Sequence, residues 1–481
     1  MNIALVIVVL YMAVLLFVAW ASAMFRRNRT AEDFLLANKQ LSWPLVGVMV
    51  AGIAVGGSST VGIAQNAYAV GMSAGWYDTA WAAGAIIVGF FLAGKIRASE
   101  HETVNKMLGS VFGDGFSTVS ACIQIIINTV IIALQIIAGG AILTALMPSV
   151  FTLSLGIIVS AAVFGLISIV GGLMAASLSN IVNIIVIYVG IIIGIISTVK
   201  HFGGMAAINT QLPAGLSGDG SHWYSLVQGM GLAAVVAWFV TMIIDAVPNG
   251  GVLQNIIAAK SPADAKKGTI FAGILMIPAG FISALFGIVA AAEFPGLASS
   301  AMALPSVVME LPGWVAGVLL AGLWAADVST ATALMMGVST MVSEDFIFKY
   351  FYKGANRAMR LRISRIVCFV VILIAYWAAT QVSNILSALM SALTLFAPYA
   401  ILMTAMFLFP STVKRSTGWL TFFFGMVTYV VVQFLFPEAR ILGQSIYTVT
   451  LMSLIGFGLS QLDRVPASTE NLFKRAQQDD M

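Results

Sequence analysis

Three short stretches of this 481-residue chain place polar residues inside long apolar runs. They are AVGGSSTVG at 54–62, DAVPNGG at 245–251 and AGLWAADVSTAT at 321–332. Adjacent glycines, and a proline followed by Asn-Gly-Gly, interrupt a helix and release its backbone carbonyls. Carbonyls released at 52–55 and facing the hydroxyls of Ser329 and Thr330 would form a set of neutral oxygens suited to a sodium ion.

The composition defines the environment of these stretches. The chain is 60% hydrophobic and only 9% charged, whereas a soluble domain carries about 25% charged residues. Apolar blocks long enough to cross a hydrocarbon core of about 30 Å as helices recur from end to end. The alternating short segments of a transmembrane barrel do not occur. We therefore predict an all-α polytopic membrane protein of the inner (plasma) membrane. Basic residues flank the spans, so nothing supports nucleic-acid binding.

Charge clusters and Gly/Pro punctuation divide the chain into thirteen predicted spans. They lie near residues 2–24, 43–70, 75–96, 115–147, 149–170, 177–199, 223–257, 267–293, 313–343, 363–380, 384–409, 417–436 and 442–461. With the N-terminus outside and the C-terminus cytoplasmic, only Lys200 and Arg440 among the basic residues lie outside, as the positive-inside rule favours.

The two interruptions fall in the second and seventh predicted spans. Each therefore opens a block of five spans, and an odd number of spans inverts the topology between the blocks. Paired interrupted helices at matching positions of inverted halves indicate the midplane site of a secondary transporter. The alternative is structural, because glycines often only let helices pack closely and hydroxyls often only bond back one turn. Because the two interruptions occupy matching positions and both lie beside polar residues, we favour a transport site over simple helix packing.

Three acidic residues lie within predicted spans: Asp78, Asp245 and Asp327. A carboxylate at membrane depth is costly, so a functional role is the default interpretation. Asp78 has the alternative of a place at the outer interface, and Asp245 is a candidate for solute or gate contact. Asp327 points about 200° away from Ser329 on a helix, which favours a structural or proton-carrying group over a sodium ligand.

The chain resembles the solute:sodium symporter family, which includes sodium/proline, sodium/pantothenate and sodium/sugar symporters. The resemblance covers nearly the whole chain. The resemblance rests on five motifs: the interrupted second span ending at 67–71, the Gly-Gly turn at 171–175, the segment 254–260, the Val328-Ser329-Thr330 motif and Ser343-Glu344-Asp345. It implies a LeuT-like fold with a five-plus-five inverted repeat.

The resemblance implies five domains along the chain. They are an extra N-terminal helix at 1–25, repeats at 43–199 and 223–409, two C-terminal helices at 417–461 and a short cytoplasmic tail at 462–481.

Site residues can be carried over from the family position by position. Sodium would bind the backbone carbonyls of Gly52, Val55 and Ala326 and the hydroxyls of Ser329 and Thr330. Polar solute contacts would come from positions matching Ser58, Ser59, Tyr77, Asp78, Asp245 and Asn249.

Three positions depart from the family pattern. Ser179-Asn180 replaces a Thr-Asp pair, which puts a second sodium ion in doubt. Gln254-Asn255 replaces a Gln-Arg pair. Asp327 stands where relatives are apolar.

These features favour a sodium-coupled symporter that imports a small organic solute. A channel, a membrane enzyme and a sensor fit less well, since no filter-like repeat occurs and the three histidines fall in predicted loops. We expect an amino acid or a small carboxylate as solute, with a sugar or a polyamine as alternatives. The expected partners are sodium, this solute and the lipid bilayer, with no cofactor beyond the coupling ion. The sequence leaves open the solute's identity, proton coupling and the oligomeric state.

Overall fold

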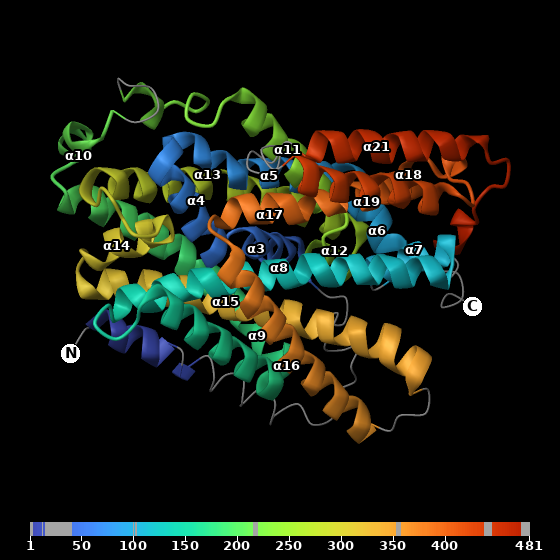
Figure 1. Ribbon diagram of the computed structural model, residues 1–481, viewed down its shortest axis with the longest axis horizontal. Coiled ribbons are helices and arrows are strands. Elements are labelled where there is room, and N and C mark those ends of the chain that lie inside the picture. Colours follow the sequence, from blue (N-terminus) through green and yellow to red (C-terminus); the bar gives the residue numbers. More distant parts are fainter. Residues whose placement is uncertain are drawn as a thin grey trace.

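The computed structural model is a bundle of helices (Figure 1). It describes residues 3–11, 13–14, 41–99, 101, 103–214, 220–352, 357–436 and 445–472, without the side chains of 170–183, 344, 345, 349, 357, 358, 361 and 471. The α-helices from residue 41 onward are α3 Trp43–Ala54, α4 Gly57–Val70, α5 Trp76–Phe91, α6 Ala93–Ser99, α7 Val104–Phe112, α8 Asp114–Leu146, α9 Leu153–His201, α10 Met205–Gln211, α11 Leu232–Ala246, α12 Gly250–Ile257, α13 Pro262–Glu293, α14 Ala303–Met309, α15 Gly313–Thr340, α16 Arg357–Gln381, α17 Ile385–Leu393, α18 Ala397–Leu408, α19 Thr417–Leu435 and α21 Ser445–Leu459.

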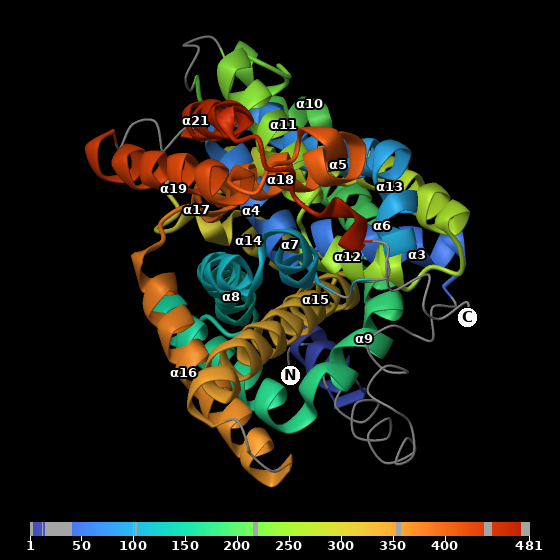
Figure 2. The same cartoon turned by 90° about the vertical axis from the view of Figure 1, so that its right-hand side faces the viewer.

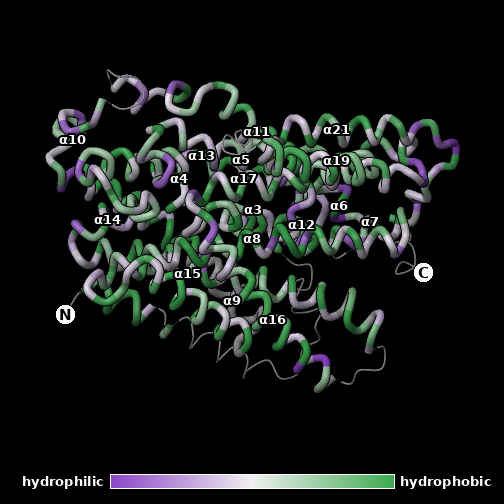
Figure 3. Tube along the Cα trace, in the orientation of Figure 1, coloured by the Kyte–Doolittle hydropathy of each residue, from purple (hydrophilic) through white to green (hydrophobic). Residues whose placement is uncertain are grey.

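The helices have the length and composition of membrane spans. Within the described residues, eight helices are long and apolar enough to cross a membrane, or up to ten if each bent pair counts as one span. Hydrophobic residues run along the helices, and hydrophilic ones gather near their ends (Figure 3). The protein is thus a multi-pass membrane protein. The thirteen spans stay a prediction, since most of the first, at 2–24, lies outside the described residues.

Both predicted helix breaks are present. Helix α3 is followed by a helical run bent from it by 48°, and α11 is followed by α12 at 46°. The second broken span differs from its predicted start at residue 223, because α11 begins only at Leu232 after a short 3-10 turn at Ser221–Trp223.

Helix α13 packs along both the first broken span and α5. Its glycines at 268, 273, 280 and 287 face the backbones of Trp43, Ala82, Gly75 and Ala64, and a Cβ at any of them would lie 2.3–2.7 Å from a carbonyl oxygen of these residues. From residue 268 to residue 287 of α13, the contacts run forward along the first broken span, from Trp43 to Ala64, and backward from Ala82 of α5 to Gly75. The chain therefore reverses at the 3-10 helix Gly71–Gly75. Gly71 permits this turn with φ of 65° while its Cα lies against the Trp223 backbone.

The helical element α9 contains two predicted spans. Near its start, the ring of Phe164 packs on Trp324, and Ser168 reaches Met335 further along α15. Near its end, Gly194 and Gly190 lie against Leu319, and the earlier Val186 lies against Gly322. The two parts therefore follow α15 in opposite directions, as two antiparallel spans require. Figure 2 shows α9, α15 and α16 on one side of the bundle and α19 and α21 on the other.

Candidate functional site

The first helix break releases four carbonyls. Helix α3 ends at Ala54, and the Gly56 amide, which would bond to the Gly52 carbonyl in a continuous helix, donates to Ser59 Oγ at 2.9 Å instead. The described hydrogen bonds include none from residues 57–59 back to the carbonyls of 53–55. The carbonyls from Gly52 to Val55 thus lack the partners that a helix supplies. Two of them belong to the expected sodium ligands.

Asp327 of α15 caps the second half of this broken span. Its Oδ1 accepts a hydrogen bond from the Ser58 amide at 2.8 Å, across 269 residues of sequence. A Cβ on Gly57 would lie 2.3 Å from Asp327 Oδ2, so only glycine leaves room for this carboxylate. The Asp327 side chain is 0% exposed, and its Oδ2 has no partner among the described residues.

The other expected sodium ligands lie on the same turn of α15. Ser329 is buried and donates to the Ala326 carbonyl at 2.9 Å, which leaves its oxygen lone pairs open. Thr330 is half-buried. The Asp327–Ser58 bond brings this turn beside the first break. Among the described residues no group of three His, Cys, Asp or Glu could hold a metal ion, so a cation here would rely on neutral oxygens.

The second break is capped from within. Asn249 Oδ1 accepts from the amides of Gly251 at 3.1 Å and Val252 at 3.3 Å, at the start of α12. Its Nδ2 donates to the Asp245 carboxylate at 3.2 and 3.4 Å. Asn is among the best N-cap residues, because its side chain replaces the missing helical acceptor. The DAVPNGG stretch therefore stabilises its own irregular backbone.

The two breaks meet in space. A Cβ on Gly251 would lie 2.9 Å from the Cδ1 atom of Ile53, in the first break. At the other end of α3 and α12, Leu41, which precedes α3, forms backbone hydrogen bonds of 3.0 Å with Ala258 and Lys260, which follow α12. The broken spans thus contact each other at their breaks and where the chain enters or leaves them.

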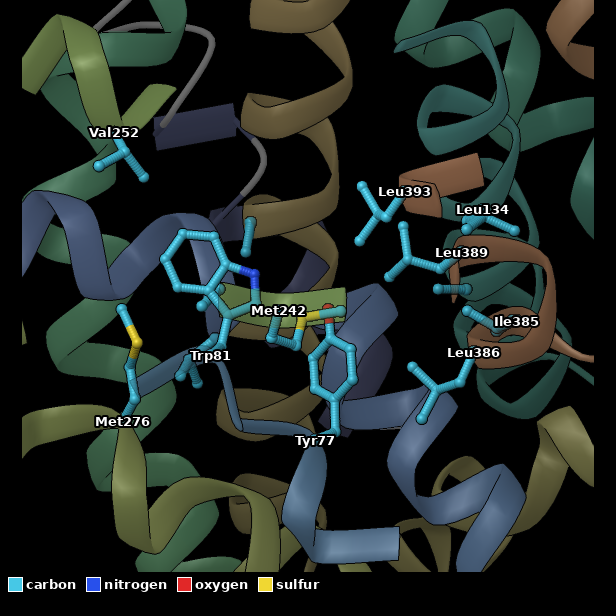
Figure 4. Close-up of a cluster of buried hydrophobic side chains, with 14 of the residues drawn as sticks. Tyr77, Trp81, Leu134, Met242, Val252, Met276, Ile385, Leu386, Leu389 and Leu393 are labelled. Atoms are coloured by element: carbon cyan, nitrogen blue, oxygen red, sulfur yellow. The ribbon is translucent and has the colours of Figure 1, made fainter. Parts of the chain in front are cut away.

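A polar and aromatic group lies where α5 faces α11. Asp245 accepts a further hydrogen bond from the Trp81 side chain. Tyr77, one turn before Trp81, packs edge-on against Trp238 with ring centroids 6.1 Å apart. Both Asp78 and Asp245 lie close enough to the Tyr77 hydroxyl to act on it electrostatically. Figure 4 shows Tyr77 and Trp81 in a buried cluster with apolar side chains of α8 and α17, including Leu134 and Leu389.

Neither Asp78 nor Asp245 has a cationic partner among the described residues. Both are 1% exposed, and Asp78 Oδ1 has no hydrogen-bond partner within the described part of the chain. Tyr188 of α9 lies within electrostatic reach of Asp78. The site therefore contains acceptor oxygens beside aromatic rings, in an apolar surround.

The structure places the expected residues in two groups, one around the Asp327–Ser58 bond and one around Asp245, Asn249 and Tyr77. Ser58 contributes its amide to the Asp327 bond, and the Ser59 hydroxyl is committed to the amide and carbonyl of Gly56. The Asn180 side chain lies outside the described residues. Sequence reasoning missed Trp81 and Gly57. The spacing of Trp81, one turn from Tyr77, was the available signal for it.

Comparisons with known proteins identify transporters as relatives. The chain is 24% identical over 389 residues to the sodium/glucose cotransporter of Vibrio parahaemolyticus, an alignment covering 74% of this chain and 70% of that protein. It is 21% identical over 414 residues to the sodium/myo-inositol cotransporter 2 of Mus musculus, covering 77% of this chain and only 60% of the mouse protein.

A solved structure shares the fold. A Na⁺-coupled sialic acid symporter in a substrate-bound outward-open state superposes with a TM-score of 0.72 at 16% identity, over 97% of this chain and 99% of that one. At this identity the likeness shows the fold alone, which is LeuT-like. Residues 34–427, most of the chain, match the model of the sodium:solute symporter family. The protein therefore belongs to the sodium:solute symporter family, whose members are transporters and not enzymes.

Proposed function

We propose that the protein is a sodium-coupled symporter that imports a small organic solute carrying a positively charged amino group. Import would proceed by alternating access, with the N-terminus outside and the C-terminus in the cytoplasm. The observation that carries the solute class is the pair of buried carboxylates, Asp78 and Asp245, which have aromatic neighbours and no described cationic partner.

An ammonium group suits this arrangement for three reasons. Its charge compensates a carboxylate that is otherwise costly at membrane depth. Its N–H groups form charge-assisted hydrogen bonds with the Asp245 carboxylate, which already accepts from Asn249 and Trp81. The faces of Tyr77 and Trp81 attract a cation through their quadrupoles. The apolar side chains around the group suit the rest of the solute.

The coupling ion would bind at the first break. In this proposal the released carbonyls of Gly52 and Val55 would supply one side of the ion's ligand shell, and the turn of α15 with Ala326, Ser329 and Thr330 would supply the other. All five proposed ligands are neutral oxygens, so none of them is a carboxylate that would neutralise the charge of the ion. The Asp327–Ser58 bond supports this assignment because it holds the two elements together.

A sugar or another polyol is the second candidate. The relatives named for glucose and myo-inositol favour it. A polyol would hydrogen-bond to Asp245 and Asn249 as neutral hydroxyl donors and acceptors. Replacing the Asp245 carboxylate by an amide would then remove no ion pair.

The test is uptake into proteoliposomes under a sodium gradient, with Asp245→Asn as the variant. For an ammonium solute, the lost charge-assisted bond is worth about 1.5–3 kcal/mol, or roughly ten- to a hundredfold in affinity. Asp114→Asn, on the exposed first turn of α8, is the matched control and should leave affinity unchanged. A change below twofold for Asp245→Asn, or uptake that does not depend on sodium, would refute the proposal.

A further inference from the structure

The N-terminus of α4 is filled by the protein's own carboxylate. This 14-residue helix begins at Gly57, in the middle of the first broken span. Asp327 Oδ1 takes the Ser58 amide, and the space that a side chain on Gly57 would need is occupied by the three carboxyl atoms of Asp327. The carboxyl group thus lies flat against the first turn of the helix.

A free helix N-terminus is an anion site, because its amides and its dipole both favour negative charge. Interrupted helices of secondary transporters use such ends to hold the anionic group of a solute. In this protein that position is closed to a solute carboxylate in two ways. The Ser58 amide is already engaged, and the volume beside Gly57 is occupied by the Asp327 carboxyl group.

The other half-helix N-terminus is also filled. Helix α12 begins with Gly250 and Gly251, and the side-chain oxygen of Asn249 accepts from the amides of Gly251 and Val252. Among the described residues, each half-helix N-terminus therefore already has an acceptor supplied by one of the protein's own side chains.

Buried carboxyl oxygens, in contrast, outnumber the hydrogen-bond donors described for them. Asp327 Oδ2 and Asp78 Oδ1 are buried oxygens that accept no hydrogen bond among the described residues. Neither carboxylate has a cationic partner there. A solute carboxylate would add a further negative charge near carboxyl groups that have no described cationic partner, whereas an amine would supply donors to oxygens that accept no described hydrogen bond.

We propose that the transported solute is an amine without a carboxylate group, and that Asp327 sets this specificity by occupying the α4 N-terminus. The inference rests on the proposed function and narrows it from amino-group solutes in general to amines. An amino acid or a small carboxylate, expected from the sequence, is then refused at the site.

The test uses pairs of compounds that differ by one carboxylate: cadaverine and lysine, agmatine and arginine, phenethylamine and phenylalanine. Thermal shift of the purified full-length protein is measured with each compound in sodium and in potassium. At least one amine should stabilise the protein in sodium, and its parent amino acid should bind at least tenfold more weakly. Myo-inositol is included as a neutral polyol.

Two variants locate the cause. Asp327→Ala empties the α4 N-terminus, so the preference for the amine over its parent amino acid should shrink at least tenfold. Asp327→Asn keeps the position filled, so it should still refuse the amino acid. If Asp327→Ala does not fold, the wild-type panel decides alone.

Each outcome has a distinct meaning. An amino acid that binds as well as its amine overturns the inference while the proposed ammonium site stands. Stabilisation by myo-inositol and by no amine or amino acid overturns both. The absence of any shift within the panel also counts against the inference. An unchanged preference in a folded Asp327→Ala protein removes Asp327 from specificity.

Discussion

The two helix breaks solve the same problem by different means. At both, the chain leaves the helix at membrane depth and starts again at an angle above 40°. The second break is closed by Asn249, which is its own N-cap and lies four residues after Asp245. The first is closed by Asp327, which belongs to another helix and lies 269 residues away.

This difference implies that the second break is stabilised locally, whereas the first break is coupled to the position of α15. The second break keeps its geometry wherever neighbouring helices move, because donor and acceptor travel together. The first break keeps its geometry only while α15 stays beside it. Since α15 also carries Ser329 and Thr330, we expect sodium binding at the proposed ligands of α15 and the geometry of the first break to be linked. We expect perturbations of the first break to alter sodium response, and those of the second to alter solute binding and local stability.

The largest effect should come from Gly57→Ala. The new methyl group would meet the Asp327 carboxyl group at 2.3–2.5 Å, so the carboxylate must leave the α4 N-terminus or the helices must separate. Overpacking of this kind costs about 1–3 kcal/mol, and we expect sodium-driven uptake to fall more than tenfold. Initial rates in proteoliposomes measure this.

Gly56→Ala is its matched control. Gly56 has extended backbone with φ of −136°, and nothing lies within 4 Å of its Cβ position. This substitution one residue away should leave uptake within twofold. Equal losses for the two variants would mean that the break tolerates no side chain at all, and the special role of Asp327 would be lost.

Removing the hydroxyls of Ser329 and Thr330 together should raise the sodium concentration for half-maximal uptake many-fold. The reason is the loss of two of the five proposed ligands from the turn beside the first break. Thr428→Ala with Ser453→Ala is the control, since those hydroxyls also bond back to carbonyls of their own helices. An unchanged sodium response in the Ser329/Thr330 variant would disprove the sodium assignment.

Asn249→Ala should destabilise the protein by about 1 kcal/mol, the usual value of an N-cap, and weaken solute binding through Asp245. Asn249→Ser restores a capping oxygen without the amide that reaches Asp245. It should recover thermal stability and not solute affinity. Sodium affinity, measured without solute, should be the same in all three proteins. A shift in sodium affinity would show that the second break is coupled as well.

The smallest effect concerns ion number. Asn180 stands where the family pattern has an acid, so we predict one sodium ion per solute, with the first break and α15 forming the coupling site. Reversal potentials in proteoliposomes give the ratio, and a value near two contradicts the prediction. Asn180→Asp is the informative variant, because a new carboxylate can create a second site.

The sequence predicted the fold through features that act locally. Glycine pairs and a proline mark both breaks, and the apolar blocks give the span positions. The Asp327–Ser58 bond could not be predicted in this way, because which residue fills a helix end across 269 positions depends on the packing of α15. Helical periodicity predicts that Asp327 faces away from Ser329, and this stays a prediction. The role of Trp81 needed the approach of α11 to α5, which no local pattern contains.

The glycines of α13 have a mechanical consequence. At four levels along this helix the neighbouring backbones of α3, α4, α5 and the turn between them lie where side chains would normally stand. Moving α13 lengthwise by one residue would bring its neighbouring side chains against those carbonyls, which opposes sliding between α13 and these backbones. We therefore expect α3, α4, α5 and α13 to move together as one rigid part in the proposed alternating-access cycle.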